Sequence, residues 1–145
     1  MTIAFAPVLA ADADSLADLR VQAMRASLER VGRFDPARAR ARLLDGFVPE
    51  HTRWILVDGE RTGFFVLKPQ DQGLLLEHLY IRPDAQGRGA GAAALQAIFA
   101  EADARGCELR VGALRESDSN RFYLRHGFQL LRQEEFDNYY VRHAA

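Results

Sequence analysis

The chain has 145 residues and a formal net charge of −1, and 48% of its residues are hydrophobic. This length and apolar content predict one domain, residues 1–145, with a sizeable core. The near-zero charge provides no basic field for nucleic acid. No apolar run is long enough to span a membrane, and no signal peptide precedes the first strand. We therefore expect a cytoplasmic protein that binds neither nucleic acid nor membrane.

The elements expected in the first half are two helices and four strands. A strand at Thr2–Val8 is followed by a helix from Ser15, whose apolar residues recur at helical spacing until Gly32. Asp35 and Pro36 are typical of a second helix start. Three strands follow, joined by an Asp-Gly hairpin and a longer turn: Thr52–Val57, Arg61–Leu67 and Leu74–Ile81, with the longer turn at Lys68–Gly73.

A helix over Ala90–Arg105, ended by Gly106, leads to a strand at Glu108–Ala113. If this is a crossover connection, that strand is parallel to the Leu74 strand. A short helix to about His126 and a closing hairpin complete the chain, with hairpin strands at Phe128–Gln133 and Asn138–Arg142. The order predicts an α+β fold: a mixed, mostly antiparallel central sheet of six to seven strands with helices on both faces.

The region from Leu74 to Arg105 carries the main chemical signal. It reads as a strand, a polar bend, a glycine turn and a helix. The first N–H groups of a helix lack partners and carry partial positive charge, so a phosphate fits there. Gly87, Gly89 and Gly91 have no Cβ and permit its close approach. We expect a pyrophosphate on the backbone amides of residues 87–91.

Three kinds of phosphate site compete for this pattern. A nucleotide P-loop needs Gly-Lys-Ser/Thr, which is absent. A dinucleotide fingerprint matches Gly87, Gly89 and Ala92, but the bend separates it from its strand. The acidic residue of that fingerprint should close the next strand, whereas Glu108 opens one. A coenzyme A site is the third possibility. No histidine, cysteine or carboxylate cluster has metal-ligand spacing, so we expect no metal.

Two segments resemble the GCN5-related N-acetyltransferase (GNAT) family, in the order and spacing of its motifs. The resemblance extends over about Thr52 to Arg142. The first segment resembles the acetyl-CoA signature and reads Leu79-Tyr80-Ile81-Arg82-Pro83-Asp84-Ala85-Gln86-Gly87-Arg88-Gly89-Ala90-Gly91. The second resembles the later motif and reads Asn120-Arg121-Phe122-Tyr123-Leu124-Arg125-His126-Gly127-Phe128.

The resemblance implies the acyl-CoA N-acyltransferase fold and direct transfer of an acetyl group from acetyl-CoA to a primary amine. The acceptor is unidentified, a small molecule in preference to a protein, and a homodimer through the C-terminal strands is possible. The implied cofactor-binding residues are Leu79, Tyr80, Ile81, Gln86, Gly87, Arg88, Gly89, Ala90, Gly91 and Asn120. Asn120 has a second interpretation as a helix cap. A non-catalytic acyl-CoA sensor is the alternative function.

The resemblance also implies catalytic and acceptor-binding residues. Tyr123 aligns with the tyrosine that protonates the departing thiolate in many members. Glu77 and His78 lie beside the expected thioester, and either of them, or a water, is a candidate base. The family's best-known catalytic glutamate falls at Leu75, so the base stays open. In this family, the joint between the first two helices usually forms a wall of the acceptor pocket. A carboxylate of the acceptor would pair there with Arg25 or Arg33, beside Phe34.

Overall fold

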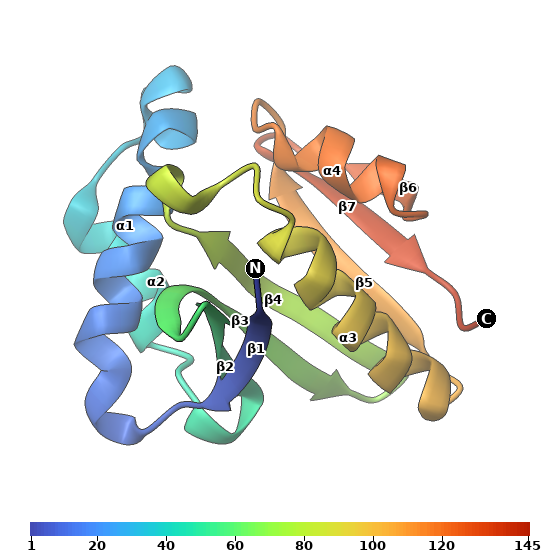
Figure 1. Cartoon of the computed structure of the whole chain (residues 1–145). Helices are drawn as coiled ribbons and strands as arrows, with labels where there is room; N and C mark the ends of the chain where they lie inside the picture. Colours follow the sequence, from blue (N-terminus) through green and yellow to red (C-terminus); the bar gives the residue numbers. More distant parts are fainter. The chain divides into compact units, whose positions relative to one another are not determined.

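The computed structural model describes residues 1–145 and contains one seven-stranded sheet with the strand order β1-β2-β3-β4-β5-β7-β6 (Figure 1). The strands are β1 Ile3–Pro7, β2 Thr52–Val57, β3 Glu60–Gln70, β4 Gly73–Ile81, β5 Glu108–Leu114, β6 Gln129–Gln133 and β7 Asp137–Arg142. The α-helices are α1 Ala13–Arg30, α2 Pro36–Leu44, α3 Ala90–Ala104 and α4 Ser119–Arg125, and the short 3-10 helices are η1 Ala10–Asp12, η2 Pro49–His51 and η3 Pro83–Ala85.

The strand directions make the sheet mixed. β4 and β5 are parallel, with Gly73–Leu76 in register with Glu108–Val111. The β1–β2, β2–β3, β5–β7 and β6–β7 pairs are antiparallel. The parallel pair follows from the crossover through α3, since two parallel neighbours need a long connection. The expected mixed, mostly antiparallel sheet with helices is therefore confirmed.

The end of β3 differs from the sequence-based expectation. Lys68 and Pro69 were expected in a turn, yet β3 continues through them to Gln70, leaving a turn at residues 71–72. The register of β3 with β2 ends at the pair of Val66 with Thr52. Beyond that pair β2 no longer needs N–H donors from β3, so a proline is tolerated in the strand.

The chain divides into two compact units, and three elements contribute residues to both. The first unit contains residues 1–66 and 78–94, and the second contains residues 67–77 and 95–145. β3, β4 and α3 each begin in one unit and end in the other. Because unfolding one unit would break these shared elements, we expect residues 1–145 to unfold as one domain.

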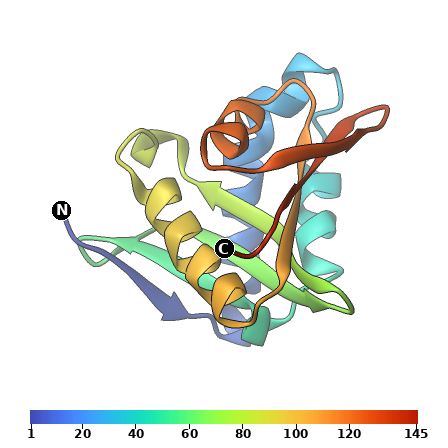
Figure 2. The same cartoon turned by 90° about the vertical axis from the view of Figure 1, so that its right-hand side faces the viewer.

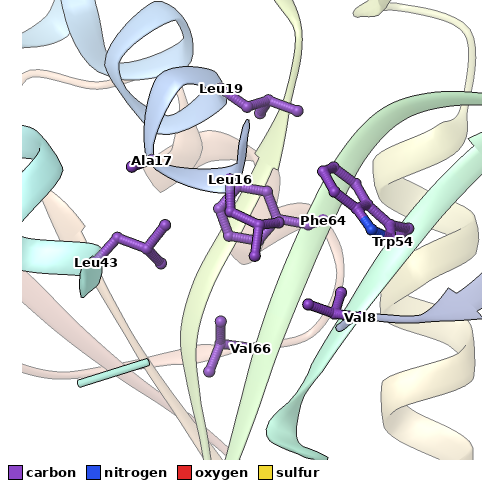
Figure 3. Packing of buried hydrophobic residues seen from close by; sticks show 8 residues of the cluster. All are labelled: Val8, Leu16, Ala17, Leu19, Leu43, Trp54, Phe64 and Val66. Carbon is purple, nitrogen blue, oxygen red and sulfur yellow. The ribbon is translucent and has the colours of Figure 1, made fainter. Parts of the chain in front are cut away.

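Helices α1 and α2 cover β2 and β3 in the first unit. The cluster of buried side chains contains Val8, Leu16, Ala17, Leu19, Leu43, Trp54, Phe64 and Val66. Figure 3 shows Leu16 of α1 and Phe64 of β3 as members of this cluster. Trp54 and Phe64 meet edge to face with their ring centroids 6.4 Å apart, a geometry favoured for aromatic pairs.

An aromatic cluster holds the second unit together. Phe99 of α3 packs against Phe128 with ring centroids 5.7 Å apart. Tyr123 of α4 lies 5.3 Å from the ring of Phe128 and 6.2 Å from that of Tyr140 on β7. Figure 2 shows α4 beside the hairpin of β6 and β7. These contacts fix the orientation of α4 on its sheet.

Asp12 joins the start of α1 to β2. Its carboxylate accepts hydrogen bonds from the Leu9 backbone N–H (2.9 Å) and from the Trp54 indole N–H (3.2 Å). The Leu9 bond first, then Trp54 and Arg61, hold the pKa of Asp12 below its ordinary value. A depressed folded-state pKa stabilises the protein above the unfolded-state pKa, and this contribution is lost as the pH falls through the folded-state pKa.

We expect Asp12→Ala to lower the free energy of unfolding at pH 7 by about 1–3 kcal/mol, because it leaves a buried indole N–H without an acceptor. Trp54 is only 2% exposed, so water does not replace the carboxylate. The difference from wild type should shrink as the pH falls below about 4, the ordinary pKa of an aspartate, because the unfolded state takes up the proton before the folded state does. Urea unfolding at pH 7 and at a pH below 4 measures this difference, with the exposed Glu135→Ala as control. An equal loss of unfolding free energy at the two pH values would contradict the contribution of the ionised carboxylate.

Candidate cofactor and catalytic site

Arg82 fixes the bend between β4 and the glycine turn. Its backbone N–H donates to the Thr62 carbonyl (2.8 Å). Its guanidinium donates to Glu60 Oε1 and to Asp84 Oδ1, each at 3.1 Å. The hydrogen bond to Glu60 is the main cause that raises the pKa of Arg82 above its ordinary value. The bend is thus tied to β3 before the chain enters the glycine turn.

A side-chain hydrogen bond and two glycine backbone conformations define the shape of the glycine turn. The Gln86 side-chain amide donates to the Ile81 carbonyl at 3.0 Å, and Ala85 is buried. Gly87 and Gly89 have φ angles of 79° and 85°, a region that side chains with a Cβ rarely adopt. The two glycines therefore set the direction of the amides between them.

The amides at the start of α3 face no carbonyl of the chain. The first helical hydrogen bond runs from Ala93 N–H to the Gly89 carbonyl at 3.0 Å, and the N–H groups of residues 87–92 donate to no backbone acceptor. The first turn contains no acidic side chain, and the neighbouring Arg88 is exposed and in no ion pair. Unpaired amides and the helix dipole favour an anion such as a diphosphate here.

Gly63 of β3 allows the end of β4 to approach closely. A Cβ at Gly63 would lie 2.3 Å from the Tyr80 carbonyl oxygen and 3.2 Å from the Ile81 Cα. Only glycine fits against this backbone without displacing it. Gly63 therefore positions the stretch Leu79–Ile81, which the sequence predicts to hold the cofactor.

His78 and Tyr80 form a hydrogen-bonded chain with Arg20 of α1. Arg20 Nε donates to the Tyr80 hydroxyl at 3.0 Å, and Arg20 Nη1 donates to the Ala39 carbonyl of α2 at 2.8 Å. The same hydroxyl lies 2.9 Å from His78 Nδ1. Sequence reasoning missed Arg20, although it interrupts the apolar stripe of α1 between Leu19 and Ala23. A buried arginine in an apolar stripe usually has a partner to bind.

The predicted acceptor residues lie at the end of α1 and the joint to α2. The Arg25 guanidinium lies 5.1 Å from the Phe34 ring centroid, so these two come together. Arg25 also pairs with Glu29 at 2.9 Å and is exposed, which makes the pair weak. The Arg33 backbone N–H caps α1 through the Leu28 carbonyl at 2.8 Å. A carboxylate reaching Arg25 would compete with Glu29.

Tyr123 and Glu77 belong to the second unit. Tyr123 is 5% exposed, with its ring in the aromatic cluster described above, so packing is one role it performs. Glu77 Oε2 lies 4.0 Å from Nζ of Lys68, the one lysine of the chain. Its side chain is partly exposed, which weakens this ion pair.

Asn120 anchors the start of α4 by a network. Its Nδ2 donates to three carbonyls, those of Leu114 (2.9 Å), Arg115 (3.2 Å) and Ser117 (2.8 Å). Its Oδ1 accepts from Asn138 Nδ2 (2.9 Å) and from the Tyr140 hydroxyl (2.7 Å). These bonds use the hydrogen-bonding capacity of the amide. They support the anchoring interpretation of Asn120, and its contact with a cofactor stays a prediction.

The structure contains no group of three or more histidine, cysteine, aspartate or glutamate side chains placed to hold a metal ion. Cys107 is a free, partly buried thiol. None of the helices combines the length and the apolar character needed to cross a membrane.

Comparison with known proteins assigns the chain to a protein family. Residues 49–130, more than half of the chain, match a family model described as an acetyltransferase (GNAT) domain. The chain belongs to the GNAT acetyltransferase family. A search of curated proteins found no significant match.

Solved structures share the fold over nearly the whole chain. The PaiA N-acetyltransferase of Thermoplasma acidophilum, solved in complex with coenzyme A, has a TM-score of 0.81 at 17% identity and covers 99% of both chains. An acetyltransferase of Thermus thermophilus has a TM-score of 0.77 at 24% identity, covering 99% of this chain and 97% of its own. A GCN5-related N-acetyltransferase of Rhodopseudomonas palustris scores 0.76 at 23% identity, covering 99% and 96%. The expected acyl-CoA N-acyltransferase fold is confirmed.

Proposed function

We propose that this protein is an N-acetyltransferase that moves the acetyl group of acetyl-CoA directly to a primary amine, on a small molecule in preference to a protein. The observation that carries the proposal is the run of unpaired amides at residues 87–92, where two glycines have positive φ. The coenzyme A complex of the Thermoplasma relative supports coenzyme A as the kind of cofactor in this proposal.

The end of β4 would hold the pantetheine arm by main-chain hydrogen bonds, as an extended ligand that adds to a strand. Leu79, Tyr80 and Ile81 supply these groups in the proposal. The Leu79 N–H would face the thioester oxygen and stabilise the negative charge that develops there. Gln86, Arg88, Ala90 and Gly91, with Gly87 and Gly89, would enclose the diphosphate.

In the proposed reaction the amine lone pair attacks the thioester carbon, the new N–C bond forms and the C–S bond breaks. An ammonium has a pKa of about 10, so the amine must first lose a proton. Glu77, His78 or a water accepts that proton. The Tyr123 hydroxyl donates a proton to the departing thiolate, since a phenol is protonated at neutral pH.

Arg25, Arg33 and Phe34 are proposed to contact the acceptor. The stacking of Arg25 on Phe34 supports a shared surface at this joint. A dimer through the C-terminal strands stays a prediction.

Thermal unfolding with acetyl-CoA, free CoA and NAD tests the proposal. Ligand binding to the folded state raises the melting temperature by mass action. We expect a rise with acetyl-CoA and with CoA but none with NAD, followed by thiol release in a screen of small amines. A rise with NAD alone would overturn the cofactor assignment. Cofactor binding without turnover on any amine would favour the alternative, a non-catalytic acyl-CoA sensor.

A further inference from the structure

We propose that Arg20 and Tyr80 are positioning residues that hold His78 as the neutral tautomer with its hydrogen on Nε2. In this state His78 acts as a hydrogen-bond donor and not as the general base. The tautomer follows from the geometry of the first unit alone. Only its consequence for acetyl transfer rests on the proposed function.

Three elements supply the chain of hydrogen bonds. Arg20 of α1 is 8% exposed and is held by the Ala39 carbonyl of α2 on one side. On the other side its Nε donates to the Tyr80 hydroxyl of β4. His78 is 4% exposed and meets this hydroxyl through Nδ1. Arg20 and His78 are buried, and buried polar groups are hydrogen-bonded with few exceptions, so the direction of each bond can be deduced.

The direction of the chain follows from what each group can donate. A guanidinium has donors only, so the Tyr80 oxygen accepts from Arg20. The hydroxyl has one hydrogen, and His78 Nδ1 is the one acceptor bonded to it. Nδ1 therefore accepts. The other tautomer and the imidazolium both carry a hydrogen on Nδ1, and either would leave the tyrosine hydrogen without an acceptor in the protein.

This arrangement assigns the proton roles more narrowly than the sequence does. Nδ1 is engaged by Tyr80, and Nε2 already carries a hydrogen, so neither nitrogen is available to take a proton from an amine. The base is then Glu77 or a water. Tyr80 also packs against Phe64 with ring centroids 5.5 Å apart, but that packing does not need the hydroxyl.

His126 supplies an internal reference with a hydrogen on Nδ1. Its Nδ1 lies 2.8 Å from the Phe122 carbonyl oxygen. A carbonyl only accepts, so Nδ1 of His126 carries the hydrogen. The same spectrum of one sample should therefore show one histidine with and one histidine without a hydrogen on Nδ1.

Long-range proton–nitrogen NMR of the full chain with labelled histidine tests the inference near neutral pH. Spectra of His78→Gln and His126→Gln assign the signals. We expect an unprotonated Nδ1 and a protonated Nε2 in His78, and a protonated Nδ1 in His126. Tyr80→Phe keeps the ring and should shift the His78 nitrogen signals towards a mixture of forms, whereas Tyr139→Phe should leave them unchanged. A protonated Nδ1 in wild-type His78, or unchanged His78 signals in Tyr80→Phe, overturns the inference.

A kinetic arm tests the donor role. Gln places an N–H near the position of Nε2 but is no base, so His78→Gln should keep turnover within about tenfold of wild type while His78→Leu loses more. Equal losses in the two variants would overturn the donor role. The spectra need neither acetyl-CoA nor turnover, so a failure of the tautomer inference is distinguishable from a failure of the proposed function.

Discussion

Replacing Tyr123 by phenylalanine should lower kcat about 100-fold or more and leave the affinity for acetyl-CoA nearly unchanged. A positioned general acid contributes about 10²–10⁴ to a rate, and the substitution removes only the hydroxyl. The ring remains to fill its place between Phe128 and Tyr140, so the fold should persist. Thiol release from acetyl-CoA, with the best amine from the screen, measures kcat, and calorimetry measures binding.

Tyr139→Phe is the matched control for this variant. Tyr139 is a half-buried tyrosine of β7 whose ring lies under the Arg132 guanidinium at 4.4 Å, a contact that needs no hydroxyl. Removing the Tyr139 hydroxyl should change neither kcat nor the melting temperature. If Tyr123→Phe turned over as fast as wild type, Tyr123 would be a core residue and the thiolate would leave without its help.

Gly89→Ala should weaken acetyl-CoA binding at least about tenfold, or 1.4 kcal/mol. Gly89 has a φ of 85°, and an L-residue there costs about 1–2 kcal/mol, which favours a turn of different shape. Its Cβ would meet no protein atom within 4 Å, so it would project into open space at the turn where the diphosphate is proposed to bind. Calorimetry with acetyl-CoA measures the affinity.

Gly106→Ala separates backbone strain from the loss of the cofactor site. Gly106 follows the other end of α3, has a φ of 62° and also has open space at its Cβ position. Both variants should lose a similar free energy of unfolding in urea, whereas only Gly89→Ala should lose affinity. Equal affinities in the two variants would place the diphosphate elsewhere.

Local patterns carried much of the prediction because their causes are local. The Asp58-Gly59 hairpin, the glycine turn and the start of α3 each depend on neighbouring residues, and the structure has them where the sequence predicts them. The helical spacing of apolar residues likewise predicted α1, since a helix repeats its exposure regularly. The predicted end of β3 was wrong. A proline is tolerated in this strand because Pro69 lies beyond the last residue pair of β3 with β2, and the sequence does not show where that pairing ends.

Backbone preferences and hydrophobic spacing act over a few residues, so the order of the elements, the mixed sheet and the glycine turn could be predicted from the sequence. The partners of the side chains could not be predicted, because they depend on how distant segments pack. Arg20 meets Tyr80 across 60 residues, and Asn120 meets Asn138 and Tyr140 across about 20. A hydrogen bond depends on distance and direction in space, and packing α1 on β4 and α4 on β7 creates both.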